Sequence, residues 1–372
     1  MAFDLFSRTT FRLSRNYSSK NMDNNTINVQ GINSVLTNLN TPLNQALLSP
    51  QNMSQKGINI DDTTVLLTPS SHNPSKTGDT FPYVWRGTTD KITSIRTFHY
   101  NLGVGGKNWV LWAIKNGIKV LVGLDLSTDS GASEIASFSS DYTSASTSLK
   151  ALYNANVIGI AIGNEETNTT SINTGLLNAQ NLKGLNSLPN VPITSVLNGD
   201  SNWLQNTYPP EGATFTANFL TLATNMDIIC FNFYSDYYSF GTLPPLSSSQ
   251  ALEVGLSWTS NGTENSVILN QFGSVRAAMI TATINKQFWC TETGWASVPT
   301  QPEVSGWSSI ANLQTYYTNF LGFSMSTPYT PQDGTFTVNP PDRIFYFCVR
   351  DVPTESNNFG LYTLASKLSP KF

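Results

Sequence analysis

Charged residues are scarce in this chain. Asp, Glu, Lys and Arg together make up 12% of its 372 residues, against about 25% in an average soluble protein. The net charge of −4 argues against a basic face, which a nucleic acid would need. Ser, Thr and Asn supply the polar surface instead, and we expect no nucleic-acid partner.

Cysteines and long apolar runs are also few. The three cysteines (Cys230, Cys290 and Cys348) all lie within apolar, strand-like runs. An odd number in such positions argues against a disulfide framework and predicts buried free thiols. The sequence has no run of 18 apolar residues, so we expect no membrane span. No cluster of His, Cys, Asp and Glu has the spacing of metal ligands, and we expect neither a metal nor another cofactor.

The first 55 residues show no sustained hydrophobic period, and we interpret residues 1–55 as an irregular N-terminal extension. The stretch "MAFDLFSRTTFRLSRNYSSKNMDNN" lacks the apolar core of a secretory signal and is faintly similar to an organelle transit peptide. Such an extension could act as a docking or assembly arm that binds protein neighbours. The compartment stays open on these observations.

From residue 56 onward, short apolar runs alternate with helical patterns. The runs are continuous, which is typical of parallel strands buried on both faces. We expect strands at 56–60, 93–98, 118–124, 157–163, 191–197, 226–234, 287–295 and 343–349. Helical patterns follow at 107–117, 140–156, 171–185, 215–224, 266–285 and 310–324.

This alternation predicts parallel βαβ units, and eight of them over residues 56–372 fit a (β/α)8 TIM barrel. The stretch 61–92 should hold the first helix of the barrel but matches a helix poorly. The alternative is a doubly wound open sheet. It is disfavoured because no Gly-rich phosphate loop follows the first strands.

In a (β/α)8 barrel, the residues just past the carboxyl ends of the strands meet at one mouth. Polar side chains stand at these positions in this sequence, although the chain is poor in charge. They are Arg96, His99, Asp125, Asn164, Glu165, Glu166, Asn198, Asp200, Asn232, Tyr234, Glu292, Trp295, Arg350 and Asp351.

Two of these residues are suited to acid–base work together. Glu165 lies just past the fourth expected strand, and Glu292 lies 127 residues later, near the end of the seventh. Strands four and seven face each other across a barrel mouth. Retaining glycoside hydrolysis needs two carboxyl groups about 5–5.5 Å apart, one protonated and one ionised. Arg96 and Tyr234 could donate hydrogen bonds to the ionised group and hold its pKa down.

The motifs around these residues resemble glycoside hydrolase family 17, the β-1,3-glucanases. "IAIGNEE" is similar to the Gly-Asn-Glu strand of that family, and "CTETGWAS" resembles its Glu-Thr-Gly-Trp-Pro-Ser signature. "SIRTF", "CFNFYS" and "FYFCVRDVPTESNNFGLY" resemble further family motifs. The resemblance covers residues 94–372 and not residues 1–55.

The resemblance implies a role for each matching residue. Glu165 would be the general acid/base and Glu292 the nucleophile. Tyr234 would position Glu292, and Arg96 would lie behind it. The substrate-binding residues would be Asn164 at the 2-hydroxyl, Tyr234, Arg96, Trp295 as a wall of the sugar site, Asn232 and Asp351. Glu166 is interpreted as a bystander.

Three departures from the family pattern put the substrate contacts in question. Ala296 and Ser235 stand where the family has prolines, and Arg350-Asp351 replaces an acidic pair. Both glutamates remain. We therefore predict a retaining endo-β-1,3-glucanase-like hydrolase or a glucan transglycosylase whose substrate is a β-glucan or another polysaccharide. The family resemblance suggests an extracellular or cell-wall location.

The alternative hypothesis is a structural or assembly component of a large particle, such as a virion, shell or fibre. It would keep the barrel as a scaffold or glycan-binding module. The N-terminal extension, the missing signal and the low charge motivate it.

Overall fold

A computed structural model describes most of the chain after residue 52. The described residues are 53–60, 81, 83–101, 106–126, 129, 131–235, 248–259, 266–298, 307–331, 336–352, 358–363 and 369–372, and all of them lie in the compact unit Gln45–Phe372. The predicted arm at 1–55 falls almost wholly outside these residues, so its role stays a prediction. Most of the expected first helix, at 61–80, is outside them too. Residues 83–92 form turns and a Val84–Lys91 bridge instead of a helix.

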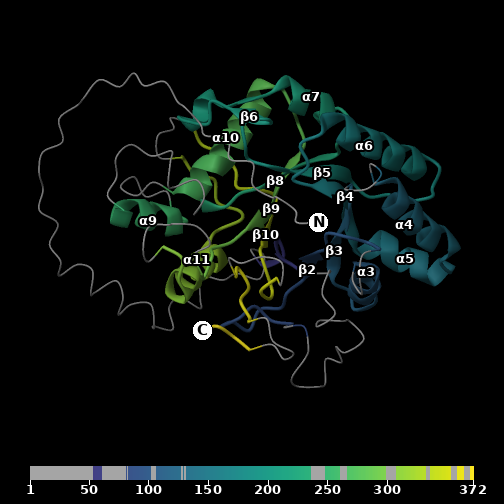
Figure 1. The fold of residues 1–372 in the computed structure, drawn as a ribbon, viewed down its shortest axis with the longest axis horizontal. Helices are drawn as coiled ribbons and strands as arrows, with labels where there is room; N and C mark the ends of the chain where they lie inside the picture. Colours follow the sequence, from purple (N-terminus) through teal and green to yellow (C-terminus); the bar gives the residue numbers. More distant parts are fainter. Residues whose placement is uncertain are drawn as a thin grey trace, which may run out of the picture. The chain divides into compact units, whose positions relative to one another are not determined.

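Eight parallel strands close into a barrel, which confirms the predicted fold and excludes the open sheet. Each strand lies at or within two residues of its predicted start. Their order around the barrel is β1-β10-β9-β8-β5-β4-β3-β2, and Figure 1 shows them at the centre with helices around them. The bounds are β1 Lys56–Asn59, β2 Ser94–Arg96, β3 Lys119–Leu124, β4 Val157–Asn164, β5 Ile193–Asn198, β8 Ile228–Asn232, β9 Gln287–Thr293 and β10 Arg343–Tyr346.

Both faces of these strands are buried, which explains their continuous apolar sequences. In β4, Ala161 packs in the interior of the barrel with residues of five other strands, whereas Ile160 and Ile162 pack in the larger apolar cluster outside the sheet. A Cβ atom on Gly57 would lie 2.4 Å from the ring of Phe345, so this position requires glycine.

Five of the described helices begin behind a Ser, Thr or Asn that caps them. The side chains of Ser146, Asn168, Thr216, Ser266 and Ser309 each accept a hydrogen bond from a backbone N–H in the first turn. Such caps stabilise a helix by about 1 kcal/mol each. The described helices are α3 Gly106–Lys115, α4 Ala132–Ser144, α5 Thr147–Asn156, α6 Thr169–Gly184, α7 Ala217–Ala223, α9 Ser248–Leu256, α10 Val267–Thr281 and α11 Ile310–Gly322.

Two details differ from the expected elements. The single helix predicted over 140–156 is wrong, because the chain is extended at Ala145 and restarts as α5 behind the cap of Ser146. The helix α9 and a small antiparallel hairpin, β6 Leu204–Gln205 with β7 Thr214–Phe215, were not expected. The hairpin extends the loop after β5, with a short 3-10 turn, η3 Pro210–Gly212, between its strands.

The three cysteines are buried free thiols, as predicted. Among the described residues, no helix is long and apolar enough to cross a membrane.

Candidate active site

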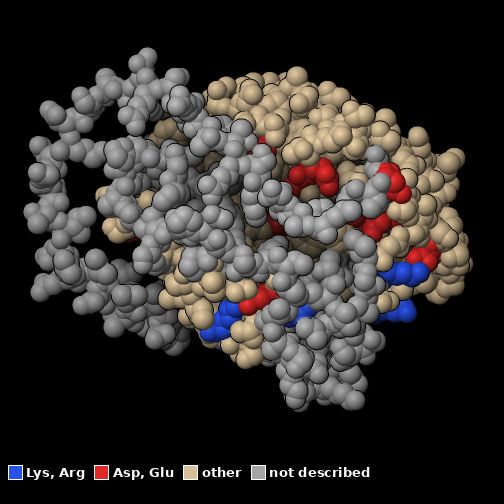
Figure 2. Space-filling model, in the orientation of Figure 1, with Lys and Arg blue, Asp and Glu red and all other residues tan. Residues whose placement is uncertain are grey.

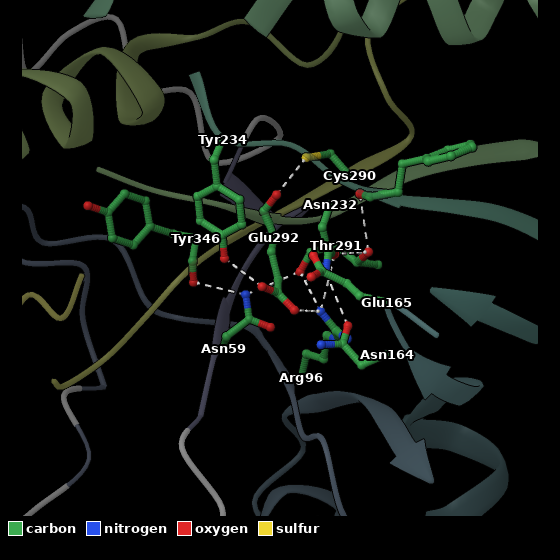
Figure 3. Close-up of polar contacts among 11 residues, drawn as sticks. Asn59, Arg96, Asn164, Glu165, Asn232, Tyr234, Cys290, Thr291, Glu292 and Tyr346 are labelled. Carbon is green, nitrogen blue, oxygen red and sulfur yellow. Dashed lines mark hydrogen bonds and ion pairs between the residues drawn. The ribbon is translucent and has the colours of Figure 1, made fainter. Parts of the chain in front are cut away.

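The carboxyl ends of the strands bring the predicted polar residues together. Arg96, Asn164 and Asn232 are the last residues of β2, β4 and β8. Glu292 lies one residue before the end of β9 and pairs in register with Asn232. Parallel strands in this register place these side chains at one mouth of the barrel, where Figure 3 shows them converging.

Glu292 is almost fully buried, with 5% of its surface exposed. Arg96 Nη1 donates to its Oε1 at 2.7 Å, and the Tyr234 hydroxyl donates to its Oε2 at 2.5 Å. Tyr234 and Arg96 approach the carboxylate from opposite sides (Figure 3). Each carboxylate oxygen therefore accepts one strong hydrogen bond, one of them from a charged donor.

Glu165 has different surroundings. Its side chain is only partly buried, and its Oε1 accepts a hydrogen bond from Asn232 Nδ2 at 2.9 Å. Burial, together with the nearby charge of Glu292, raises the pKa of the Glu165 carboxyl from 4.5 to about 7. Asn232 and Arg96 oppose this rise but do not cancel it. Glu165 can therefore hold a proton near neutral pH.

The backbone at the end of β4 turns sharply to present Glu165. Gly163 has φ 77° and Glu165 has φ 59°, both in the left-handed region. This conformation costs a non-glycine residue about 1–2 kcal/mol. The Glu165 N–H donates to the Val196 carbonyl at 2.9 Å, which holds the turn against β5. Backbone strain of this kind clusters at functional sites.

Arg96 links Glu292 to Asn164, the neighbour of Glu165. Its Nη2 donates to Asn164 Oδ1 at 2.6 Å, and Nη1 also donates to the Thr291 carbonyl at 3.1 Å. The guanidinium lies over the ring of Phe98, 4.4 Å from its centroid. A planar group held at both ends and on one face has little freedom to move. Arg96 thus fixes Glu292 and Asn164 relative to each other.

Asn232 completes the network. Its Oδ1 accepts from the Thr291 hydroxyl at 2.8 Å, which orients the amide. Its Nδ2 then faces Asn164 Oδ1 at 3.1 Å and Glu165 Oε1 at 2.9 Å. The structure thus brings together Arg96, Asn164, Glu165, Asn232, Tyr234 and Glu292, all of which the sequence analysis singled out.

Trp295 and Asp351 lie in other surroundings. Trp295 is 0% exposed, stacks on Trp307 and donates from Nε1 to the Trp307 carbonyl at 2.9 Å. An indole enclosed in this way packs the core and offers no face to a sugar, so the predicted wall role does not fit its placement. Asp351 is buried in an ion pair with Lys371, at 2.6 Å between Oδ1 and Nζ. Burial raises the pKa of Asp351, and Lys371 opposes the rise.

Further carboxylates lie around the two glutamates and form an acidic rim. Glu166, Asp125 and Asp200 are partly exposed, and burial raises the pKa values of Glu166 and Asp200. Figure 2 shows carboxylates around a hollow in this face, with Lys and Arg further from it. A mouth of this charge repels anionic ligands and suits a neutral one.

Three residues of the site were missed in the sequence analysis. The Thr291 hydroxyl orients Asn232, and Phe98 lies under Arg96. Asn59, at the end of β1, is fully buried and donates from Nδ2 to the Thr291 and Tyr346 carbonyls at 3.2 Å each. The signal used for the other residues, a polar side chain at a strand end, would have found Asn59.

Two carboxyl groups in unequal surroundings can divide acid–base work between them. The partly exposed Glu165 can give a proton, and the ion-paired Glu292 can act as a nucleophile. In the part of the chain that the structure describes, no three His, Cys, Asp or Glu side chains gather as a metal site.

Solved glucan-acting enzymes share this fold. A β-1,3-glucanase and allergen of Cryptomeria japonica pollen aligns with a TM-score of 0.57 and 18% identity, over 86% of this chain and 98% of its own. A plant β-glucan endohydrolase aligns with a TM-score of 0.54 and 17% identity, over 73% and 88%. An active-site mutant of a Rhizomucor miehei β-1,3-glucanosyltransferase, in complex with laminaritriose, aligns with a TM-score of 0.51 and 12% identity, over 86% and 97%.

No protein-family model matches the chain, and no curated protein matches it. What the solved structures share with this chain is the (β/α)8 barrel fold. The chain's solved structural neighbours include β-1,3-glucanases and glucanosyltransferases, which confirms at the level of the fold the resemblance predicted from the motifs.

Proposed function

We propose that this protein is a retaining glycoside hydrolase of the endo-β-1,3-glucanase type, or a transglycosylase with the same first half-reaction. The observation that carries the proposal is the unequal pair of glutamates. Glu165 has a pKa raised to about 7, and Glu292 is held by Arg96 and Tyr234. The names of the structural neighbours support a β-1,3-glucan as the substrate.

In the first half-reaction, the Glu292 carboxylate attacks the anomeric carbon and forms a glycosyl ester. The bond from that carbon to the leaving oxygen breaks, and Glu165 gives its proton to this oxygen. In the second half-reaction, Glu165 takes a proton from the attacking water, and the ester to Glu292 breaks. A sugar hydroxyl in place of water gives transfer instead of hydrolysis.

The other polar residues hold this pair in place. Asn164, fixed by Arg96 and Asn232 at 2.6 and 3.1 Å, would bind the sugar 2-hydroxyl. Tyr234 and Arg96 would hold the Glu292 carboxylate in position to attack the anomeric carbon. The acidic rim around the site would repel an anionic polysaccharide but not an uncharged glucan.

Reducing-end release from laminarin tests the proposal. Glu165→Gln and Glu292→Gln should each lower kcat at least ~1000-fold, since each removes one half of the acid–nucleophile pair. Glu166→Gln is the matched control, because it removes the adjacent carboxylate and should keep activity within ~3-fold. Full activity in either of the first two variants would refute the catalytic assignment.

Azide rescue distinguishes the two roles. With an aryl β-glucoside, Glu292→Ala plus azide should yield the α-glycosyl azide, because azide replaces the nucleophile. Glu165→Ala plus azide should yield the β-glycosyl azide, because azide then attacks the glycosyl–Glu292 ester. The opposite pairing of products would exchange the two assignments.

A further inference from the structure

Lys371 forms a buried polar cluster next to the site. Only 4% of its side-chain surface is exposed. Its Nζ donates to Asp351 Oδ1 at 2.6 Å, to the Asn358 carbonyl at 2.7 Å and to Ser297 Oγ at 2.8 Å. These partners come from the loops after β9 and β10. The Lys371 ammonium group therefore joins the loop after β9, the strand that carries Glu292, to the loop after the neighbouring strand β10.

Further contacts fix the segment 358–361 in the same place. Gly360 N donates to Asp351 Oδ1 at 3.0 Å, and Ser297 Oγ donates to the Asn358 carbonyl at 2.6 Å. A Cβ atom on Gly360 would lie 2.1 Å from the Asp351 nitrogen. The two backbone segments are thus in direct contact, and the Lys371–Asp351 ion pair lies at their junction.

Phe359, held within this segment, reaches the catalytic network. Its ring lies 5.2 Å from that of Tyr234 and 5.8 Å from that of Phe347, between centroids. Phe347 also packs edge-on against Tyr234 at 6.2 Å. The Tyr234 hydroxyl donates to Glu292 Oε2 at 2.5 Å. A continuous chain of contacts therefore runs from Lys371 through Phe359 and Tyr234 to Glu292.

We propose that Lys371 is a positioning residue that keeps Phe359 against Tyr234 and thereby fixes the Tyr234–Glu292 hydrogen bond. Its effect on turnover rests on the proposed function, whereas its effect on Tyr234 does not. A lysine whose partners are a carboxylate, a hydroxyl and a carbonyl cannot be replaced by an apolar side chain without removing the ion-pair partner of the buried Asp351 carboxylate.

The first measurement does not depend on activity. 3-Fluorotyrosine placed at Tyr234 reports its surroundings by ¹⁹F NMR in the full chain. Lys371→Met and Phe359→Leu should each shift or broaden this resonance, and Lys371→Arg should restore the wild-type spectrum. Lys286→Met is the matched control, because Lys286 likewise donates to backbone carbonyls, those of Ala223 and Met226, but belongs to the loop that precedes β9. It should leave the resonance unchanged.

The second measurement is steady-state hydrolysis of laminarin well below each unfolding midpoint. Lys371→Met should lower kcat about 10-fold with KM nearly unchanged, and Lys371→Arg should recover most of it. Lys286→Met should keep the wild-type kcat even if its midpoint falls. A Lys371→Met protein with an unaltered ¹⁹F resonance would overturn the inference. An inactive wild-type protein would instead overturn the proposed function, and the ¹⁹F comparison would still decide the role of Lys371.

Discussion

At the scale of residues, two chemically identical side chains differ because of their partners. Glu292 accepts hydrogen bonds from a guanidinium and a phenol, so its negative charge is balanced where it lies. Glu165 is desolvated by burial, faces the charge of Glu292 and has one amide donor, so its ionised form is disfavoured. Separation of the two protonation states is what an acid–nucleophile pair requires.

The pH dependence of kcat/KM should reflect this separation. Glu165 must be protonated to act as an acid, so activity should fall as the pH rises through about 7, its folded-state pKa. The Asn232 amide stabilises the ionised form. Asn232→Leu should therefore raise the pKa of Glu165 and move the alkaline limb to higher pH, besides lowering kcat. An alkaline limb at the same pH in both proteins would contradict this assignment.

The raised pKa of Glu165 also predicts that the folded protein loses stability as the pH rises. The pKa of Glu165 is about 7 when folded and near its ordinary value of 4.5 when unfolded. The folded protein therefore binds more protons between these values, and its unfolding free energy falls as the pH rises through them. The unfolding free energy of Glu165→Gln, measured relative to that of the wild type, should therefore rise by about 1–3 kcal/mol between pH 4.5 and pH 8.

Urea unfolding of both proteins at the two pH values measures this gain. Glu166→Gln serves as the reference for removal of a neighbouring carboxylate. A stability difference between the Glu165→Gln protein and the wild type that does not change with pH would show that Glu165 titrates normally.

At the scale of elements, buried polar side chains join strands, helices and loops. The Glu134 carboxylate, in α4, accepts from the backbone nitrogens of Tyr100, Asn101 and Asp125 at 2.9, 2.8 and 2.6 Å. One side chain thus holds the loops after β2 and β3 beside the mouth. Lys56, the first residue of β1, donates to the carbonyls of Leu321 and Phe323 at 2.7 Å each and so caps the end of α11.

Because of Lys56, the unfolding free energy of the barrel should increase as the pH rises above neutral. Burial lowers the pKa of its ammonium group from 10.5 to about 7. The unfolded chain then binds more protons between these values, so the unfolding free energy rises with pH across this range. The unfolding free energy of the wild type, measured relative to that of Lys56→Met, should rise by about 2 kcal/mol between pH 7 and pH 9.

Chemical denaturation of both proteins at these pH values tests the effect. Comparison with the Lys56→Met variant removes the contributions of all other titrating groups. Parallel pH profiles for the two proteins would show that Lys56 stays charged in the folded barrel.

Strands were predicted better than helices, for a physical reason. A strand buried on both faces must be apolar throughout, as "VIGIAIG" is. The helices carry much Ser, Thr and Asn, so the pattern over 140–156 did not reveal the interruption at Ala145. The cap by Ser146 that restarts the helix is a local signal, but Ser is common throughout this chain.

At the scale of the whole molecule, the barrel closes within one segment. Its eight strands and the described helices all lie in the unit Gln45–Phe372. A protein comprising residues 45–372 should therefore unfold cooperatively at the same midpoint as the full chain and release reducing ends at the same rate. Loss of cooperative unfolding would show that residues 1–44 belong to the barrel core.

Size-exclusion chromatography of the same two proteins tests the predicted assembly arm. The shortened protein lacks residues 1–44 of the predicted arm at 1–55. If that part binds further copies of the protein, the full chain should elute as a larger species and the shortened protein as a monomer. Equal elution as monomers would remove the basis for the assembly hypothesis.

The sequence by itself determined the barrel and the two glutamates. Continuous apolar runs predict strands that are buried on both faces. The polar residues at the ends of these runs predict the side chains that line the mouth of the barrel. Only the tertiary structure decided which polar groups meet. Asn59, Thr291 and Lys371 bind partners up to 287 residues away, and Trp295 proved to be enclosed. Such contacts depend on strand register and loop packing, which no local pattern encodes.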